Sequence, residues 1–239
     1  MIFKGKLIQK DNKNKMNRTR RSAANIKRIR SCKKVGGSCK REGHRKEAVF
    51  NQLYNPSCSD ITMKAEADCE IVVGHPILKT LVEKGIIDST DKRNTSNKSG
   101  KSIQFTLGNI PELEDSKKNL EIMQNTLECK MILNKYLKKI NSNRPADLMV
   151  YDSEKSHIFF NMDQTIDFIC RNATFRKIEE TGRIKGDFND KSSRTGKRAL
   201  LTYEKRNKKG YFLGFSGGQG KLFINLLKDN INFHEQSHE

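Results

Sequence analysis

The sequence predicts a mixed α/β or α+β domain that follows a basic arm. Segments with helical spacing of apolar residues alternate along the chain with short apolar runs typical of strands. Proline and glycine residues stand between these segments at positions typical of helix starts, helix ends and turns. Of the 239 residues, 47 are Lys or Arg and 28 are Asp or Glu, which gives a formal net charge of +19.

The expected helices over residues 43–54 and 111–140 carry apolar residues at helical spacing. Pro76 stands near the first turn of the second expected helix, Gly85 follows its end, and Pro111 opens the third. The expected helices span residues 43–54, 76–84, 111–140, 163–171 and 219–228.

Strands are expected where short apolar runs stand between turn residues. Lys98 ends one such strand, a tight Ser99-Gly100 turn follows, and the next strand begins at Ser102. The two runs on either side of Asp152-Ser153-Glu154 are expected to pair. The expected strands span residues 68–73, the segment that ends at Lys98, and residues 102–107, 148–151, 158–160, 183–188, 200–205 and 211–215.

Most of the positive charge lies in the N-terminal arm. Residues 1–46 hold 17 Lys or Arg against Asp11 and Glu42, a net charge of +15, so residues 47–239 carry about +4. Such an arm buries too little apolar surface to offset its chain entropy, and we expect it to be poorly ordered on its own. Two interpretations stay open: an arm that binds nucleic acid with a steep dependence on salt, or a solvated or targeting tail.

Cysteine spacing and hydropathy indicate an intracellular protein, cytoplasmic or nuclear. The six cysteines are scattered with no Cys-x-x-Cys pair, so we expect reduced thiols and no zinc site. No apolar run reaches the length of a transmembrane helix. Lys4, Lys6 and Lys10 interrupt the region where a secretory signal would have its apolar core, so neither secretion nor membrane insertion is expected.

Two carboxylates and a lysine suggest metal-assisted cleavage of phosphodiesters. Asp68 begins an expected strand, Glu47 lies on the first expected helix, and Lys98 lies on a later strand. A Mg²⁺ ion held by carboxylates would neutralise the phosphate and lower the pKa of its bound water, while the lysine orients that water. The alternatives are an edge-strand charge for Asp68, a solvated Lys98 and a helix-surface ion pair for Glu47. Asp60 is a rival for the metal position.

These residues resemble the motif of the PD-(D/E)xK nuclease superfamily. The resemblance spans roughly Gly43 to Leu107, about a quarter of the chain. Glu47 matches the family's helical glutamate, Asp68 matches its strand aspartate, and Ser96-Asn97-Lys98-Ser99-Gly100 matches its acid-x-Lys segment followed by Ser-Gly. Ser96 stands where the family has an acid, and Ala67 precedes Asp68 where it usually has proline.

The resemblance implies a restriction-endonuclease-like mixed β-sheet flanked by helices. It also implies hydrolysis of DNA with Mg²⁺, or Mn²⁺ in its place, that leaves 5′-phosphate and 3′-hydroxyl ends. Asp68, Glu47 and Glu70 would bind the metal, and Lys98 would position the attacking water. Gln104, on the following strand, would be a secondary orienting group.

The C-terminal half offers candidate contacts to nucleic acid. Phe175, Phe188 and Tyr203 are interleaved with basic residues in segment 172–206, a pattern of either a β-ribbon that contacts phosphates and guanine edges or a charged, solvent-facing sheet. The glycine-rich segment 216–221 is either a tight strand–helix turn or a DNA-backbone contact. The candidate contacts are Arg176, Arg183, Lys185, Arg194, Lys197, Arg198 and Lys221.

Together these features predict a Mg²⁺-dependent DNA endonuclease. Residues 1–42 would be a flexible arm and residues 43–239 a nuclease-like domain, with its catalytic core in 43–145 and DNA contacts in 146–239. Double-stranded DNA is the expected partner, and a homodimer is expected if the target is a palindromic duplex. The rivals are a non-catalytic nucleic-acid-binding protein and an RNA-directed protein.

Overall fold

The computed structural model divides the chain into two units, residues 1–46 and 47–239, and the description below concerns the second. The expected basic arm and Asp68 lie outside the residues that the structure describes. The described residues are 45–56, 69–108, 110–113, 118–137, 139–140, 144–178, 180–181, 183–190, 194–205, 211–215 and 218–238.

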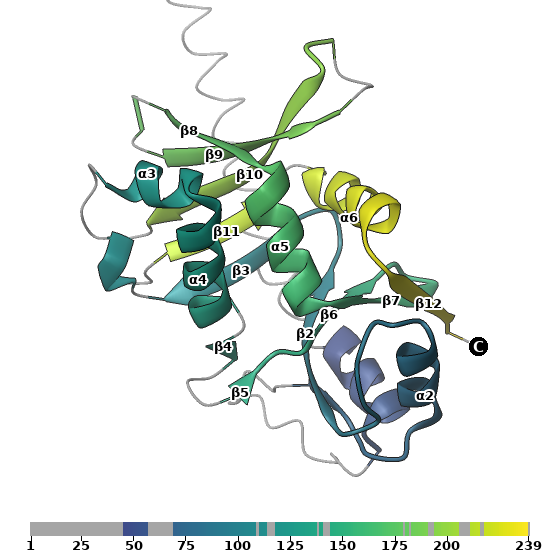
Figure 1. Ribbon diagram of the computed structural model, residues 1–239. Coiled ribbons are helices and arrows are strands. Elements are labelled where there is room, and N and C mark those ends of the chain that lie inside the picture. Colours follow the sequence, from purple (N-terminus) through teal and green to yellow (C-terminus); the bar gives the residue numbers. More distant parts are fainter. Residues whose placement is uncertain are drawn as a thin grey trace, which may run out of the picture. The chain divides into compact units, whose positions relative to one another are not determined.

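One five-stranded sheet, sheet A, is mixed and has the order β1-β2-β6-β7-β12 (Figure 1). Strands β2 and β6 run parallel, whereas the other neighbouring strands are antiparallel. Its strands are β1 (Cys69–Ile71), β2 (Arg93–Ser99), β6 (Leu148–Asp152), β7 (Ser156–Asn161) and β12 (Phe233–Ser237).

The other five-stranded sheet, sheet B, is antiparallel throughout and has the order β3-β11-β10-β9-β8. Its strands are β3 (Ile103–Gly108), β8 (Thr174–Ile178), β9 (Arg183–Asn189), β10 (Lys197–Lys205) and β11 (Tyr211–Phe215). The two sheets make the fold mixed α/β, as the sequence predicts; β8 and β12 were not expected.

Three residues, Gly100 to Ser102, carry the chain from β2 in sheet A to β3 in sheet B. The Tyr151 hydroxyl of β6 donates a hydrogen bond to the Gly100 carbonyl at 2.8 Å. The Gly220 N–H donates to the Lys101 carbonyl at 3.2 Å. A Cβ atom at Gly220 would stand 2.9 Å from that carbonyl oxygen, so glycine permits this close approach.

The expected long helix over residues 111–140 is wrong. Asn125 has an extended backbone, and its side chain accepts hydrogen bonds from Leu127 N and Glu128 N, so it caps a new helix. The segment instead contains a 3₁₀ turn η1 (Pro111–Leu113), α3 (Asn119–Gln124), α4 (Thr126–Tyr136) and β4 (Lys139–Ile140), which pairs with β5 (Arg144–Pro145).

The other expected helices are confirmed with small changes at their ends. Gly85 follows α2 with φ +65°, a left-handed conformation that favours glycine. The first helix covers residues 45–54. The others are α2 (Pro76–Glu83), α5 (Met162–Asn172) and α6 (Gln219–Asn230).

The central strands β6 and β7 of sheet A are buried on both faces. Leu148 and Val150 of β6 belong to a smaller core with Phe50 and Tyr54 of helix 45–54 and with residues of α2. The residues that alternate with them, Met149 and Tyr151, point into a larger core shared with the inner face of sheet B and helices α3 to α6. Within the described residues, no helix combines the length and apolar character needed to cross a bilayer.

Candidate functional site

Lys98 points from β2 toward the larger core. It lies opposite Tyr151 of β6, and its Nζ atom is 4.7 Å from the centre of the Phe105 ring. A lysine ammonium over an aromatic ring gains about 0.5–1 kcal/mol at partly exposed positions. Lys98 is therefore held between the two sheets.

Glu70 shares this face of sheet A but lies far along it from Lys98. It pairs with Asn94, which is four residues before Lys98 on β2, so the two side chains are separated by about 13 Å along the strand. The Glu70 carboxylate is 3.5 Å from the Lys92 ammonium. The structure therefore does not place Glu70 and Lys98 around one ion.

Glu47 belongs to the other side of sheet A. Its helix packs through Phe50 and Tyr54 into the smaller core, whereas Lys98 points to the larger one. The structure thus separates Glu47 from Lys98, and Asp68 lies outside the described residues. In the described part of the chain, no three His, Cys, Asp or Glu side chains are grouped closely enough to hold a metal ion.

A row of polar residues crosses the outer face of sheet B. Gln104 lies opposite Gly214, Gly214 opposite Thr202, Thr202 opposite Lys185, and Lys185 opposite Arg176. Gln104 and Arg176 are exposed, and Lys185 and Thr202 are partly exposed. The alternate residues of these strands are buried in the larger core. Strand alternation therefore puts the expected orienting group Gln104 on the same surface as two expected nucleic-acid contacts.

Further basic residues extend this surface. Arg183 precedes Lys185 by two residues on β9, and Lys197 lies opposite Asn189 of the same strand. Both side chains are exposed. We call the surface formed by Arg176, Arg183, Lys185 and Lys197 the basic face.

Ion pairs fix two of the expected arginines. Arg176 Nε lies 2.7 Å from Asp187 Oδ2, and Arg198 Nε lies 2.6 Å from Asp190 Oδ2. Both carboxylates are mostly buried, so they anchor the guanidinium groups while lowering the local positive charge.

The other two expected nucleic-acid contacts, Arg194 and Lys221, are not part of the basic face. Arg194 is exposed in the connection between β9 and β10. Lys221 lies on α6, whose Phe223 stacks on Phe215 with 3.9 Å between the ring centres, on the inner side of sheet B. Lys221 is therefore not part of the outer row.

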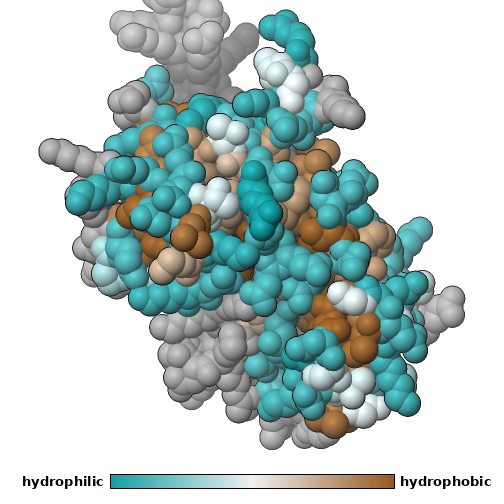
Figure 2. All heavy atoms as spheres, in the orientation of Figure 1, coloured by the Kyte–Doolittle hydropathy of each residue, from teal (hydrophilic) through white to brown (hydrophobic). Residues whose placement is uncertain are grey.

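The aromatic residues of segment 172–206 do not face solvent where their side chains are described. Phe175 and Phe188 are almost fully buried. Figure 2 shows a mainly hydrophilic surface with small apolar patches. The exposed large apolar residues of the described chain are Val49, Leu53, Val73, Leu127 and Met131. None of these can stack on a base, so the basic face is suited to phosphate contacts.

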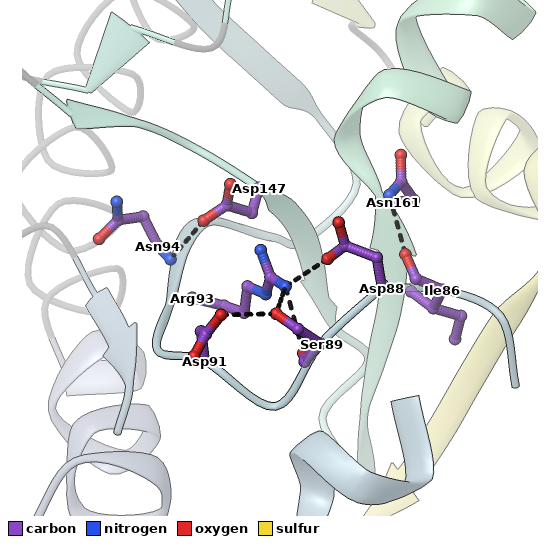
Figure 3. Close-up of polar contacts among 8 residues, drawn as sticks. All are labelled: Ile86, Asp88, Ser89, Asp91, Arg93, Asn94, Asp147 and Asn161. Carbon is purple, nitrogen blue, oxygen red and sulfur yellow. Dashed lines mark hydrogen bonds and ion pairs between the residues drawn. The ribbon is translucent and has the colours of Figure 1, made fainter. Parts of the chain in front are cut away.

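A second polar site is a cavity of about 380 Å³ at the end of sheet A where β2 and β6 begin and β7 ends (Figure 3). We call it the acidic cavity because three of its lining residues are aspartates. Its lining residues are Gly85, Ile86, Ile87, Asp88, Arg93, Asp147, Asn161 and Asp163.

Hydrogen bonds to the backbone fix Asp147 and Asn161, two of the residues that line the acidic cavity. Asp147 Oδ2 accepts from Asn94 N at 3.0 Å, and Asp147 N donates to Asn94 O at 2.9 Å. Asn161 donates from Nδ2 to Ile86 O at 2.8 Å, and its Oδ1 caps α5 by accepting from Gln164 N at 2.9 Å. Asp147 is thereby fixed at the start of β6 (Figure 3).

Arg93 balances part of the negative charge in the acidic cavity. Its Nη2 donates to Asp88 Oδ1 at 2.5 Å and to Ser89 Oγ at 2.6 Å, while its buried Nε has no hydrogen-bond partner among the described residues. A backbone hydrogen bond and then the Arg93 guanidinium lower the pKa of Asp88. The cavity is therefore lined by three carboxyl groups and by one guanidinium group that already pairs with Asp88.

Sequence reasoning missed the residues of this cavity as a group. Asp147 directly precedes a buried strand and Asp163 lies in the first turn of a helix, which are both common positions for acids. The β6–β7 hairpin brings Asp147 and Asp163 together, and the parallel pairing of β2 with β6, between segments about fifty residues apart, adds Asp88 and Arg93. The sequence signal for this cavity is the position of Asp147 directly before the buried strand β6.

Comparison of the chain with models of known protein families, with curated proteins and with solved structures found no match. The function is therefore inferred from the basic face and the acidic cavity.

Proposed function

We propose that the protein binds nucleic acid through the basic face of sheet B. The observation that carries this proposal is the outer row in which Arg176 and Lys185 lie side by side on neighbouring strands, with Arg183 and Lys197 on the same surface. Lysine and arginine side chains on such a surface contact phosphates without reading sequence. The net charge of +19 supports the same partner.

Binding of the full-length protein to a fluorescent DNA duplex tests this proposal. We expect the Arg176→Ala/Lys185→Ala variant to bind more weakly, and the slope of log K against log salt to fall by about 1 for each lost phosphate contact. Lys79→Ala is the matched control because Lys79 is an exposed lysine on α2, away from sheet B. Equal affinities for the double variant and the control would refute the proposal. Competition with an RNA duplex separates a DNA-directed from an RNA-directed protein.

A second candidate function is Mg²⁺-dependent cleavage of DNA, and the acidic cavity is the observation that favours it. Asp88, Asp147 and Asp163 line the cavity but are not grouped closely enough to be three ligands of one ion. One or two of these carboxylates would be sufficient, because Mg²⁺ prefers hard oxygen ligands and keeps several waters. Mg²⁺ would supply a bound water of lowered pKa. Arg93, which also lines the cavity, would place its positive charge beside the phosphate. The alternative centre is the one expected from the motif, with Lys98 and Asp68 but without Glu47, whose helix packs on the other side of sheet A.

Nicking of a supercoiled plasmid in Mg²⁺ or Mn²⁺ tests cleavage and its location together. If the acidic cavity is the centre, Asp147→Asn/Asp163→Asn abolishes nicking and leaves DNA binding intact, while Lys98→Ala retains activity. If nicking is lost in the Lys98→Ala variant but kept in Asp147→Asn/Asp163→Asn, the centre lies at the residues expected from the motif. Binding without any cleavage by the unmodified protein leaves the non-catalytic binder. Thermal unfolding of each variant verifies that it is folded.

A further inference from the structure

Two buried thiols meet between α4 and α5. Cys129 of α4 and Cys170 of α5 are free cysteines, and their Sγ atoms are 2.8 Å apart. The exposed fraction is 0% for Cys129 and 5% for Cys170, and both residues belong to the larger core. Figure 1 shows the two helices side by side. In a disulfide the sulfur atoms are about 2.05 Å apart, so little movement separates this contact from a bond.

The surrounding contacts hold the two helices in this register. Lys130, the residue after Cys129, forms an ion pair of 2.6 Å with Asp167, which lies three residues before Cys170 on α5. Asp167 also pairs with Arg171 at 2.8 Å. The two helices are thus in contact at two nearby points, through the Lys130–Asp167 ion pair and through the two unbonded sulfur atoms.

We propose that Cys129 and Cys170 are a modification site, at which a low-molecular-weight disulfide such as oxidised glutathione converts the two thiols into an intramolecular disulfide. One cysteine thiolate attacks the oxidant and releases one glutathione thiolate, which leaves a protein–glutathione mixed disulfide. The other cysteine thiolate attacks that mixed disulfide and releases the second glutathione thiolate. The two cysteine protons end on the released thiolates, so the net products are the Cys129–Cys170 disulfide and two reduced glutathione molecules. This inference is independent of the proposed function.

Burial makes the reaction slow but favours ring closure. The neighbouring Cys129 sulfur and then burial raise the pKa of the Cys170 thiol, so few thiolates are present in the closed structure. The oxidant must therefore enter when α4 and α5 separate locally. A glutathione adduct does not fit a core position, whereas the second thiol stands next to the first, so re-packing of the helices favours the internal disulfide.

Non-reducing peptide mapping of the full-length protein after treatment with oxidised glutathione tests the proposal. Cleavage after Lys118, Lys130, Lys155 and Arg171 places Cys129 in peptide 119–130 and Cys170 in peptide 156–171. We expect these two peptides to appear joined, with a mass two hydrogen atoms below their sum, and reduction to separate them. Because the bond closes a loop of about forty residues, we also expect the oxidised protein to unfold roughly 5 to 10 °C higher.

Two variants complete the test. Cys129→Ser leaves a single thiol, so it should give no joined peptides and no increase in Tm on oxidation. A protein with Cys32, Cys39, Cys58 and Cys69 changed to Ser should still form the bond, which excludes exchange through the other cysteines. Thiols at 129 and 170 that stay free at the temperature where the helices open would refute the proposal. So would a stable glutathione adduct on either residue, or a disulfide that lowers Tm.

Discussion

At the scale of single residues, Tyr54 shows how burial alters chemistry in this protein. Its side chain packs against Phe50 and Phe159, and its hydroxyl lies 3.2 Å from His157 Nδ1. Burial raises the pKa of Tyr54 from 10.0 to about 12, because the phenolate would lose its hydration in the smaller core. The unfolded chain therefore loses this proton at lower pH than the folded protein.

This shift predicts a specific loss of stability in alkali. Below pH 10 the tyrosine is neutral in both states and its contribution is complete; between pH 10 and about 12 the unfolded state ionises first, so the free energy of unfolding falls as pH rises. Tyr54→Phe should remove this part of the decline and remove one late step from the tyrosinate absorbance titration. Identical pH profiles for the two proteins in this window would contradict the assignment.

Residue spacing predicted where strands lie better than it predicted on which face of the sheet each side chain lies. Glu47 and Lys98 were expected to meet at one ion, yet the helix of Glu47 packs on one side of sheet A and Lys98 points to the other. A strand position changes face with each residue, so a motif quoted as letters does not fix where its side chains meet. The acidic cavity depends on strand pairing between distant segments, which no local pattern encodes.

At the scale of elements, the break between α3 and α4 depends on the side chain of Asn125. Its Oδ1 accepts from Leu127 N at 3.0 Å and from Glu128 N at 3.2 Å, which satisfies two amides that have no partner within the helix. Apolar spacing continues across the break, which is why residues 111–140 were expected to form one helix. A capping residue therefore overrides periodicity here.

Removal of this cap should destabilise the protein without changing its fold. We expect Asn125→Ala to lower the free energy of unfolding by about 1 kcal/mol and Tm by roughly 2–4 °C, whereas Asn125→Asp should keep most of the stability because it retains the acceptor. Urea denaturation of the three proteins measures both effects. If Asn125→Ala is as stable as the unmodified protein, the cap does not hold α4.

The strands that the sequence missed are polar edge strands. Among the described strands, β12 (Phe233–Ser237) pairs only with β7, and its side chains are exposed or partly exposed; β8 (Thr174–Ile178) is an edge of sheet B with one buried residue. Edge strands are stabilised by main-chain pairing more than by apolar packing, so apolar runs do not reveal them. The buried strands β6, β7 and β11 were found because each contains an apolar run, which in β7 is residues 158–160.

At the scale of the whole second unit, each sheet combines strands from both halves of the chain. β2 pairs with β6 and β3 pairs with β11, so the expected catalytic core 43–145 and DNA-contacting part 146–239 share both sheets. A composition-based division of the chain cannot detect such pairing, because it concerns segments that are far apart in sequence.

Separation of the chain between residues 145 and 146 should therefore abolish independent folding. We expect neither fragment alone to show cooperative thermal unfolding. In the separate fragments β2 would lose its partner β6, β3 would lose its partner β11, and much of the larger core would be exposed. Mixing the fragments should restore a transition if their strands pair. A sharp transition in either isolated fragment would show that this half is an autonomous domain.

The passage from Gly100 to Ser102 has a mechanical consequence. The Gly100 carbonyl accepts a hydrogen bond from Tyr151, and the Lys101 carbonyl accepts one from Gly220 in the first turn of α6. These bonds fix the backbone between the last residue of β2 and the first residue of β3. A shift of β2 by one residue in sheet A would therefore require a shift of β3 in sheet B, and each shift would change the pairing with the neighbouring strands. A short, hydrogen-bonded stretch of backbone therefore connects the strand that borders the acidic cavity with sheet B, which carries the basic face.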